Sequence, residues 1–392
     1  MKLTYKATML SCFTGYVILA ITNNFFPLLL VTFQGVYRLS LAQLSFLITL
    51  TFGTQLVADV LASKYADRFG YRTLILFAHA AITAGFLSLT ILPDVLEPFW
   101  GFAIAIILYA LGAGITDVLL SPIMESCPTE NKETAMSLLH SFYCWGHVAV
   151  ITLSTLFFYF WGTQNWKILA CLWAALPVFN GILFSRVPIF PLVSPEQNQL
   201  GLKSLLSNKT FWLLILMMVC AGACEISIGQ WASAFAEQSL GISKTAGDLA
   251  GPMIFAILMG TSRAFYGKHG NKIPLDRFMR ISTILCIASY LLASLSGSAV
   301  LSLIGCALSG LGIGIMWPGI ISKAASSLCL GGTIMFALLS IAGDFGCTIG
   351  PGLVGLVSGT ADGNLKMGIL AATIFPLLLL LTLIPIKKNT IE

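Results

Sequence analysis

The sequence contains few charged residues. Only 9% of its 392 residues are Asp, Glu, Lys or Arg, whereas soluble domains contain about 25%. Hydrophobic residues make up 57% of the chain, and its mean hydropathy is +0.91. A water-soluble fold could not bury this much apolar surface, so the soluble globular classes are excluded. We therefore expect the solvent of this chain to be lipid.

The sequence also lacks the motifs of most enzymes and metal proteins. It contains no zinc-type His/Cys spacing, P-loop, nucleophile elbow or dinucleotide fingerprint. Its ten cysteines form no CxxC pair and lie mostly in apolar segments, which favours buried small side chains over a metal or redox site. We therefore expect no enzymatic activity, no cofactor and no metal. Without a hydrolytic domain, transport driven by ATP is disfavoured.

About twelve apolar segments follow one another along the chain, each of about 20 residues and long enough to cross a hydrocarbon core of about 30 Å. The first contains the polar residues Asn23 and Asn24 and no small-residue cleavage site, so we interpret it as a membrane helix and not as a signal peptide. The predicted fold is an all-α polytopic membrane protein, with helices near residues 8–33, 41–63, 73–92, 99–122, 135–160, 166–185, 211–236, 246–266, 278–296, 299–322, 332–357 and 367–386.

The two halves of the sequence resemble each other at an offset of 200 residues. Leu111–Ile115 (LGAGI) reappears as Leu311–Ile315 (LGIGI), and Gly70 is matched by Gly270. The least hydrophobic connection is the proline-containing stretch in the middle of the chain. We therefore predict two pseudo-symmetric six-helix bundles, residues 1–186 and 211–392, joined by a cytoplasmic linker, residues 187–210. Two related hydrophobic halves are the layout of a secondary transporter, with its binding site where the halves meet.

Positive charge is distributed unevenly between the predicted loops. With both termini in the cytoplasm, 17 Lys and Arg residues lie inside and four lie outside. This asymmetry follows the positive-inside rule, and it accounts for the net charge of +5 without any nucleic-acid partner. We expect a monomer in the inner (plasma) membrane with both termini cytoplasmic. The four outside cations are Arg38, Lys167, Lys244 and Lys366.

A few ionisable residues interrupt the predicted membrane helices. Such groups are costly in lipid and usually face the interior of a bundle or a water-filled cavity. Asp117 follows a glycine-rich stretch, and a carboxyl group in a desolvated cavity can gain and lose a proton near neutral pH. We therefore predict that Asp117 couples proton movement to solute binding; the alternative is a structural hydrogen bond. Glu225 and Asp344 are further candidates for proton coupling, and the alternative for Glu225 is a pair with Arg263.

A second set of residues suits a sugar-like solute. His140 and Tyr143 lie one turn apart on the same face of the fifth helix. Amides and an indole complete the set, because amides bind hydroxyl groups and a sugar ring packs on an aromatic plane. The alternatives are hydrogen bonds between helices for the polar residues and core or lipid packing for the tryptophan. The predicted substrate-binding residues are Asn23, Asn24, His140, Tyr143, Gln230 and Trp317.

A third set lies near the predicted cytoplasmic ends of the helices. Asp59 lies about two turns before Asp67, and Arg68 and Arg72 follow directly. Their charge and position favour a cytoplasmic gate over a substrate contact. Arg263, at the predicted end of the eighth helix, is the candidate gate residue of the second half.

The stretch from Ser63 to Arg72, SKYADRFGYR, resembles the loop signature G-x-x-x-D-R-x-G-R-R of the major facilitator superfamily, with Ser63 in place of the first glycine. A closer resemblance covers most of the chain and is to the fucose permease family of sugar–proton symporters. The matching stretches are Asn23–Asn24 followed by Gln34, Gly112–Pro122, Leu138–Gly146 and Gly314–Pro318.

This resemblance implies that Asp117 falls on the helix 4 carboxylate that is central to proton coupling in that family. It also implies that His140 and Tyr143 fall on family amide positions. The chain departs from the family pattern at Pro27, where the family has a second acid. The coupling scheme can therefore differ, with Glu225 or Asp344 compensating, and fucose itself is not assumed to be the solute.

Together these features predict a secondary active transporter that takes up a sugar or related polyhydroxylated solute with protons by alternating access. Its partners would be the solute, the lipid bilayer and protons, with sodium as the alternative coupling ion. Two other functions stay open from the sequence. They are efflux of drugs or metabolites by antiport, and a sensor or scaffold that binds a solute without transporting it.

Overall fold

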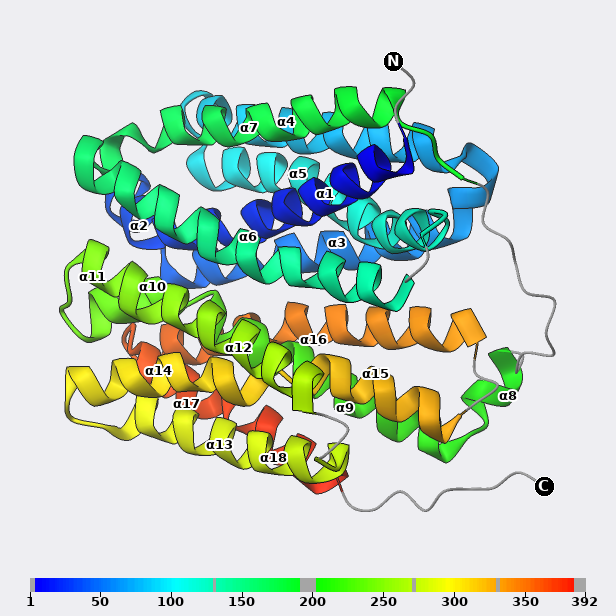
Figure 1. Cartoon of the computed structure of the whole chain (residues 1–392). Helices are drawn as coiled ribbons and strands as arrows, with labels where there is room; N and C mark the ends of the chain where they lie inside the picture. The colour runs from blue at the N-terminus through cyan, green and yellow to red at the C-terminus, as the bar shows by residue number, and fades with distance from the viewer. Residues whose placement is uncertain (1–3, 130–131, 191–201, 270–272, 329–331, 384–392) are drawn as a thin grey trace. The chain divides into compact units, whose positions relative to one another are not determined.

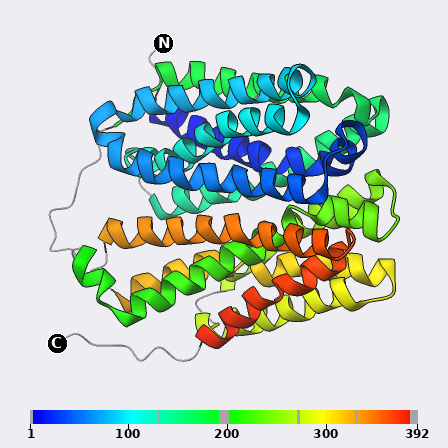
Figure 2. The same cartoon turned by 180° about the vertical axis from the view of Figure 1, so that it is seen from behind.

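The computed structural model describes residues 4–129, 132–190, 202–269, 273–328 and 332–383. Within these ranges every regular element is a helix, and twelve helical spans are long and apolar enough to cross a membrane. The predicted all-α polytopic fold is therefore confirmed. The chain divides into two compact units, residues 1–194 and 195–392, and each contains six of the twelve spans (Figures 1 and 2).

The first unit contains long helices with short breaks. Its elements are α1 (Tyr5–Asn24), η1 (Phe26–Leu29), α2 (Leu30–Tyr37), α3 (Leu41–Phe69), α4 (Tyr71–Val95), α5 (Pro98–Glu125), α6 (Lys132–Trp161), η2 (Thr163–Asn165) and α7 (Trp166–Arg186). α4 packs along both α5 and α7, while α1 contacts α5, α6 and α7 (Figure 1). α1 is therefore surrounded by helices of its own unit, which places its polar side chains among theirs.

The second unit has more interruptions. Its elements are α8 (Leu202–Leu206), α9 (Lys209–Gly229), α10 (Ala232–Ala234), η3 (Phe235–Ser239), α11 (Lys244–Asp248), η4 (Leu249–Met253), α12 (Ile254–His269), α13 (Leu275–Leu295), α14 (Ala299–Ile313), α15 (Met316–Ser327), α16 (Gly332–Thr360), α17 (Leu365–Ala372) and α18 (Ile374–Thr382). α16 packs along α9, and α13 packs along α14 (Figures 1 and 2).

Breaks in the helices fall beside several of the predicted site residues. α1 ends at Asn24 and continues as the 3₁₀ helix η1, which has Pro27 in its first turn. A proline has no backbone N–H to donate, so it cannot continue the hydrogen-bond ladder of α1. The helix predicted over residues 211–236 ends at Gly229 in the structure, and Gln230 is its C-cap. Glycine weakens a helix, and the buried Trp231 that follows donates its indole N–H to the Pro351 carbonyl, 3.1 Å away.

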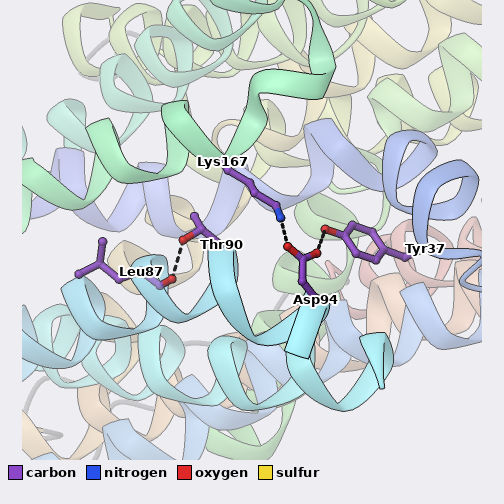
Figure 3. A network of polar contacts seen from close by, with 5 residues as sticks. All are labelled: Tyr37, Leu87, Thr90, Asp94 and Lys167. Carbon is purple, nitrogen blue, oxygen red and sulfur yellow. Dashed lines mark hydrogen bonds and ion pairs between the residues drawn. The ribbon is translucent and has the colours of Figure 1, made fainter. Parts of the chain in front are cut away.

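In each unit, two neighbouring membrane spans are joined by a lysine or arginine contact at each of their two ends. In the first unit, Arg72 at the start of α4 donates to the carbonyls of Phe184 and Val187 at the end of α7, at 2.6 and 2.7 Å. At the opposite ends of the same helices, Lys167 forms an ion pair with Asp94, which also accepts a 2.9 Å hydrogen bond from Tyr37 (Figure 3). Helix C-termini expose carbonyls without partners, so an arginine there is favourable.

The second unit has the same arrangement. Arg280 of α13 donates to the Leu383 carbonyl at the end of α18, 3.4 Å away. At the other end of α13, Lys366 of α17 donates to the Ser296 carbonyl, 2.7 Å away. Lys167 and Lys366 thus act alike in the two halves, as the internal repeat of the sequence would suggest. We call these four cation contacts the end clamps of the two units.

Candidate functional site

Neutral polar side chains from three helices meet inside the first unit. Gln55 of α3 donates its amide to Oδ1 of Asn23 on α1, 2.6 Å away, and Asn23 in turn lies 3.5 Å from the hydroxyl of Tyr143 on α6. The Tyr143 ring faces the His147 ring one turn on, with centroids 6.4 Å apart. Asn23 and Gln55 are buried, whereas Tyr143 is partly exposed. This group presents amide and hydroxyl donors and acceptors without a net charge.

Asp117 on α5 interacts with Tyr16, which lies on the same helix, α1, as Asn23. The Tyr16 hydroxyl lies 3.3 Å from the hydroxyl of Ser121, one turn further along α5 than Asp117, and it interacts with the Asp117 carboxyl. The Tyr16 ring also packs edge-on against the ring of His140, with centroids 5.2 Å apart. His140 is exposed and Asp117 is partly exposed. The structure thus brings together a carboxyl, two hydroxyls and an imidazole from α1, α5 and α6.

Close packing of α3 on α5 positions the two polar groups of the first unit. A side chain added to Gly114 would lie 2.6 Å from the Gln55 carbonyl oxygen and 2.8 Å from Asp59 Oδ1. Only glycine allows the two helices to approach this closely. The glycine-rich stretch before Asp117 therefore fixes the distance between α3, which carries Gln55, and α5, which carries Asp117.

In the second unit, Glu225 and Arg263 form an ion pair at 3.4 Å, and both side chains are mostly buried. Arg263 also donates from Nε to the Gly314 carbonyl, 3.0 Å away. That carbonyl has no helical donor, because the residue four positions later is Pro318, which lacks an N–H. Arg263 therefore supplies the hydrogen bond that the break between α14 and α15 removes. The pair proposed for Glu225 as the alternative to proton coupling is present.

The remaining second-unit candidates lie in different environments. Trp317, in the first turn of α15, is partly exposed and lies over Gly343 of α16. Asp344 is partly exposed, and Gln230 is buried at the end of α9. In the first unit, the amide of Asn24 donates to the Ala20 carbonyl of its own helix, 2.8 Å away. Its donor is thus occupied within α1.

The described gate candidates lie in different surroundings within their own units. Asp59 is buried against α5, and Arg68 is exposed with its guanidinium over the Phe69 ring. Arg72 is one of the end clamps, and Arg263 pairs with Glu225. The side chain of Asp67 lies outside the described part of the structure. Part of the linker predicted over residues 187–210 also lies outside the described residues; the described part includes α8.

We call Asn23, Gln55, Tyr143, Tyr16 and Asp117 the first-unit site. Two of these residues were absent from the predicted substrate and proton sets. Tyr16 contacts Asp117, and Gln55 contacts Asn23. The sequence carries a signal for Tyr16, since it lies seven residues before Asn23 and therefore on the same helix face. The contact of Gln55 depends on the approach of α3 to α1, for which the sequence pattern has no signal.

The comparison with known proteins decides the family. Residues 10–351 match the family model of the Major Facilitator Superfamily. The chain belongs to this superfamily. It is therefore a multi-pass membrane transporter and not an enzyme, as the sequence predicted. The finer resemblance to the fucose permease family stays a prediction.

Similar proteins include several transporters. Membrane protein MosC of Rhizobium meliloti is 23% identical over 365 residues, which span 91% of this chain and 84% of that protein. The xylose transporter XylE of E. coli shares the fold with a TM-score of 0.78, at 12% identity, over 99% of both chains. A bacterial homologue of the human lysosomal transporter Spinster, inward-facing and occupied, has a TM-score of 0.76 at 13% identity, over 96% of this chain and 95% of its own. At these identities the solved structures show the fold alone.

Proposed function

We propose that this transporter takes up a sugar or a related polyhydroxylated solute together with protons, by alternating access. The proposal is supported by the polar side chains inside the first unit, where α1 contributes to an amide–hydroxyl group through Asn23 and interacts with the carboxyl of Asp117 through Tyr16. Asn23 and Tyr143 offer donors and acceptors of the kind that sugar hydroxyls need. Asp117, in contact with the Tyr16 hydroxyl, is the proposed proton carrier. The closer likeness to fucose permeases, and a cytoplasmic location of both termini, belong to the same proposal.

The contacts of Glu225 and Asp117 distinguish these two acids as candidate proton carriers. Glu225 forms an ion pair with Arg263 at 3.4 Å, so its carboxylate already has a structural partner. Within the described residues, Asp117 forms no ion pair with a lysine or arginine, and it interacts with the neutral hydroxyl of Tyr16. We therefore assign the proton to Asp117 and a structural charge to Glu225, with Asp344 as the second choice.

One solved structure with this fold is a D-xylose–proton symporter, which has a TM-score of 0.76 at 12% identity over 94% of this chain and 96% of that one. At that identity the likeness adds only that the fold can house this kind of transport. The chemistry of the solute is argued from the residues of the first-unit site.

Solute exchange in proteoliposomes tests the proposal. Purified protein is reconstituted, loaded with each of a panel of hexoses, pentoses and polyols, and assayed by counterflow without a proton gradient. We expect accelerated exchange of at least one solute, and Asn23→Ala should raise its half-saturation concentration. Thr22→Val is the matched control, because the Thr22 hydroxyl donates to the Ile18 carbonyl of its own helix. Exchange of none of the panel would reject the sugar class, and exchange of apolar drugs instead would favour efflux by antiport.

A further inference from the structure

The indole of Trp317 lies directly against the backbone of Gly343. A Cβ atom built on Gly343 would lie less than 3.0 Å from three carbons of the six-membered ring of Trp317. Real Cβ atoms essentially never approach another heavy atom this closely. The position of the ring, on α15, therefore depends on the absence of a side chain at residue 343, on α16.

Gly343 is also held from its other side. A Cβ on Gly222 of α9 would collide with the carbonyl oxygen and carbon of Gly343. One turn further along α16, a Cβ on Gly346 would collide with the Val219 carbonyl of α9. The α16 backbone thus lies in direct contact with α9 at residues 343 and 346. Because α9 blocks a retreat of the backbone, a methyl group at residue 343 must move the Trp317 ring.

The main chain of Trp317 is anchored, so its side chain is the part that can respond. The residue lies in the first turn of α15, directly after the break at Gly314 and Ile315. Pro318 follows it, and Arg263 holds the Gly314 carbonyl at 3.0 Å. Proline restricts the backbone of its predecessor as well as its own. Displacement by a methyl group would therefore appear as a rotation of the indole.

We propose that Gly343 is a positioning residue for solute specificity. It sets the orientation of the Trp317 indole, and through that plane it determines which ring-shaped solutes the second unit accepts. This inference rests on the proposed sugar transport, in which the partly exposed Trp317 ring packs on the solute. Residue 343 then tunes the preference among solutes without touching them.

The experiment is a double-mutant cycle in which the half-saturation concentration and the ranking of solutes are measured by solute exchange. Gly343→Ala is introduced into the unaltered chain and into the Trp317→Phe background, where the shorter ring leaves room for the methyl group. In the unaltered chain we expect Gly343→Ala to raise the half-saturation concentration of the best solute by about three- to tenfold, the worth of one aromatic contact. The ranking of the solutes in the panel should also change. In the Trp317→Phe background, Gly343→Ala should change neither the half-saturation concentration nor the ranking of the solutes.

Gly310→Ala is the matched control for general damage. Its Cβ would collide with the Phe255 backbone, also at a close contact between helices, but Trp317 is not among its near neighbours. We expect it to lower the amount of folded protein and the maximal rate, with the same half-saturation concentration and the same solute ranking. The proposal is overturned if Gly343→Ala behaves like Gly310→Ala, or if it raises the half-saturation concentration equally in both backgrounds.

The same cycle separates this inference from the proposed function. If the unaltered protein exchanges no solute of the panel, the proposed transport of sugars is rejected. The four proteins of the cycle are then compared by their apparent unfolding temperatures in detergent. Gly343→Ala should then lower the unfolding temperature of the unaltered chain and leave that of the Trp317→Phe background unchanged. An equal loss in both would overturn the positioning role of Gly343.

Discussion

Within each unit, one pair of membrane spans is joined by the same kind of contact at its ends. The polar side chains inside the two units differ. Both use a cation at each end of one helix pair, with Arg72 and Lys167 in the first unit and Arg280 and Lys366 in the second. Inside, the first unit has a neutral amide–hydroxyl group and the carboxyl of Asp117. The second has a charge pair and an indole. The repeat thus preserved the scaffold, while the two interiors acquired different chemistry.

This difference suggests a division of work between the units. Asp117 interacts with a neutral hydroxyl, whereas Glu225 forms an ion pair with Arg263. In this account the first unit carries the proton on Asp117 and the hydroxyl-binding amides, and the second supplies the aromatic plane of Trp317 on a framework made rigid by Glu225 and Arg263. Substitutions in both units test that division.

The ion pair of the second unit should be the most sensitive point. We expect Arg263→Met to destabilise the protein by about 3 kcal/mol, because it leaves the Glu225 charge unpaired and the Gly314 carbonyl without its donor. Glu225→Gln should cost less, since Arg263 keeps its bond to Gly314. In the double variant the loss should be smaller than the sum of the two single losses. Denaturation in detergent measures all three, and additive losses would show that the pair does not act as a unit.

The end clamps should be unequal in strength. Arg72→Gln removes two hydrogen bonds from a charged donor, at 2.6 and 2.7 Å, and we expect a loss of about 2 kcal/mol. Arg280→Gln removes a single bond of 3.4 Å and should cost less than about 1 kcal/mol. Apparent unfolding temperatures of the two variants make the comparison. If Arg280→Gln were the more damaging, the clamps would not act through these bonds.

A change within the first-unit site should affect binding more than stability. Tyr143→Phe removes a hydroxyl that lies 3.5 Å from Asn23, and such contacts in membrane proteins contribute about 0.6 kcal/mol. We expect an increase of about threefold in the half-saturation concentration for exchange, because the hydroxyl is a proposed solute contact, and a loss of stability of no more than about 0.6 kcal/mol. His147→Gln, at the neighbouring buried ring, is the comparison variant. A fall in stability without a change in half-saturation would indicate that Tyr143 serves packing alone.

The exposed end clamp of the first unit should be the weakest. Lys167 and Asp94 have side chains that are 36% and 48% exposed, so solvent screens their attraction. We expect Asp94→Asn to lower stability by about 0.5 kcal/mol, and less in high salt. Tyr37→Phe removes the second partner of Asp94 and serves as the control. A salt-independent loss of several kcal/mol would show that this network is shielded from solvent.

Much of the fold could be predicted because hydrophobic length and repetition determine it. The twelve spans follow from apolar segments of sufficient length, and the half-repeat anticipates two six-span units. The break at Gln230 was not predicted, because the apolar run continues past Gly229 to residue 236. Hydropathy measures how well a residue suits lipid. It does not predict which acceptor a buried indole such as Trp231 donates its hydrogen bond to.

The predicted site residues stay a prediction, and the structure shows their surroundings. Asn23 and Tyr143 lie with Gln55, and His140 and Asp117 lie around Tyr16, which depends on how closely the helices approach. The role of Arg263 could not be read from its position near the end of a span, since its partners lie 38 and 51 residues away in the chain. Contacts of that kind are decided by helix packing and not by local pattern.

Proton coupling through Asp117 is tested by one paired measurement of exchange and uphill uptake. Reconstituted Asp117→Asn protein is assayed for exchange at equal pH on both sides and for uphill uptake driven by an inward proton gradient. We predict that exchange persists, because the amide keeps the shape of the side chain and its reach to Tyr16, while uphill accumulation is lost. Uphill accumulation equal to that of the unaltered protein would contradict the account and remove Asp117 as the proton carrier.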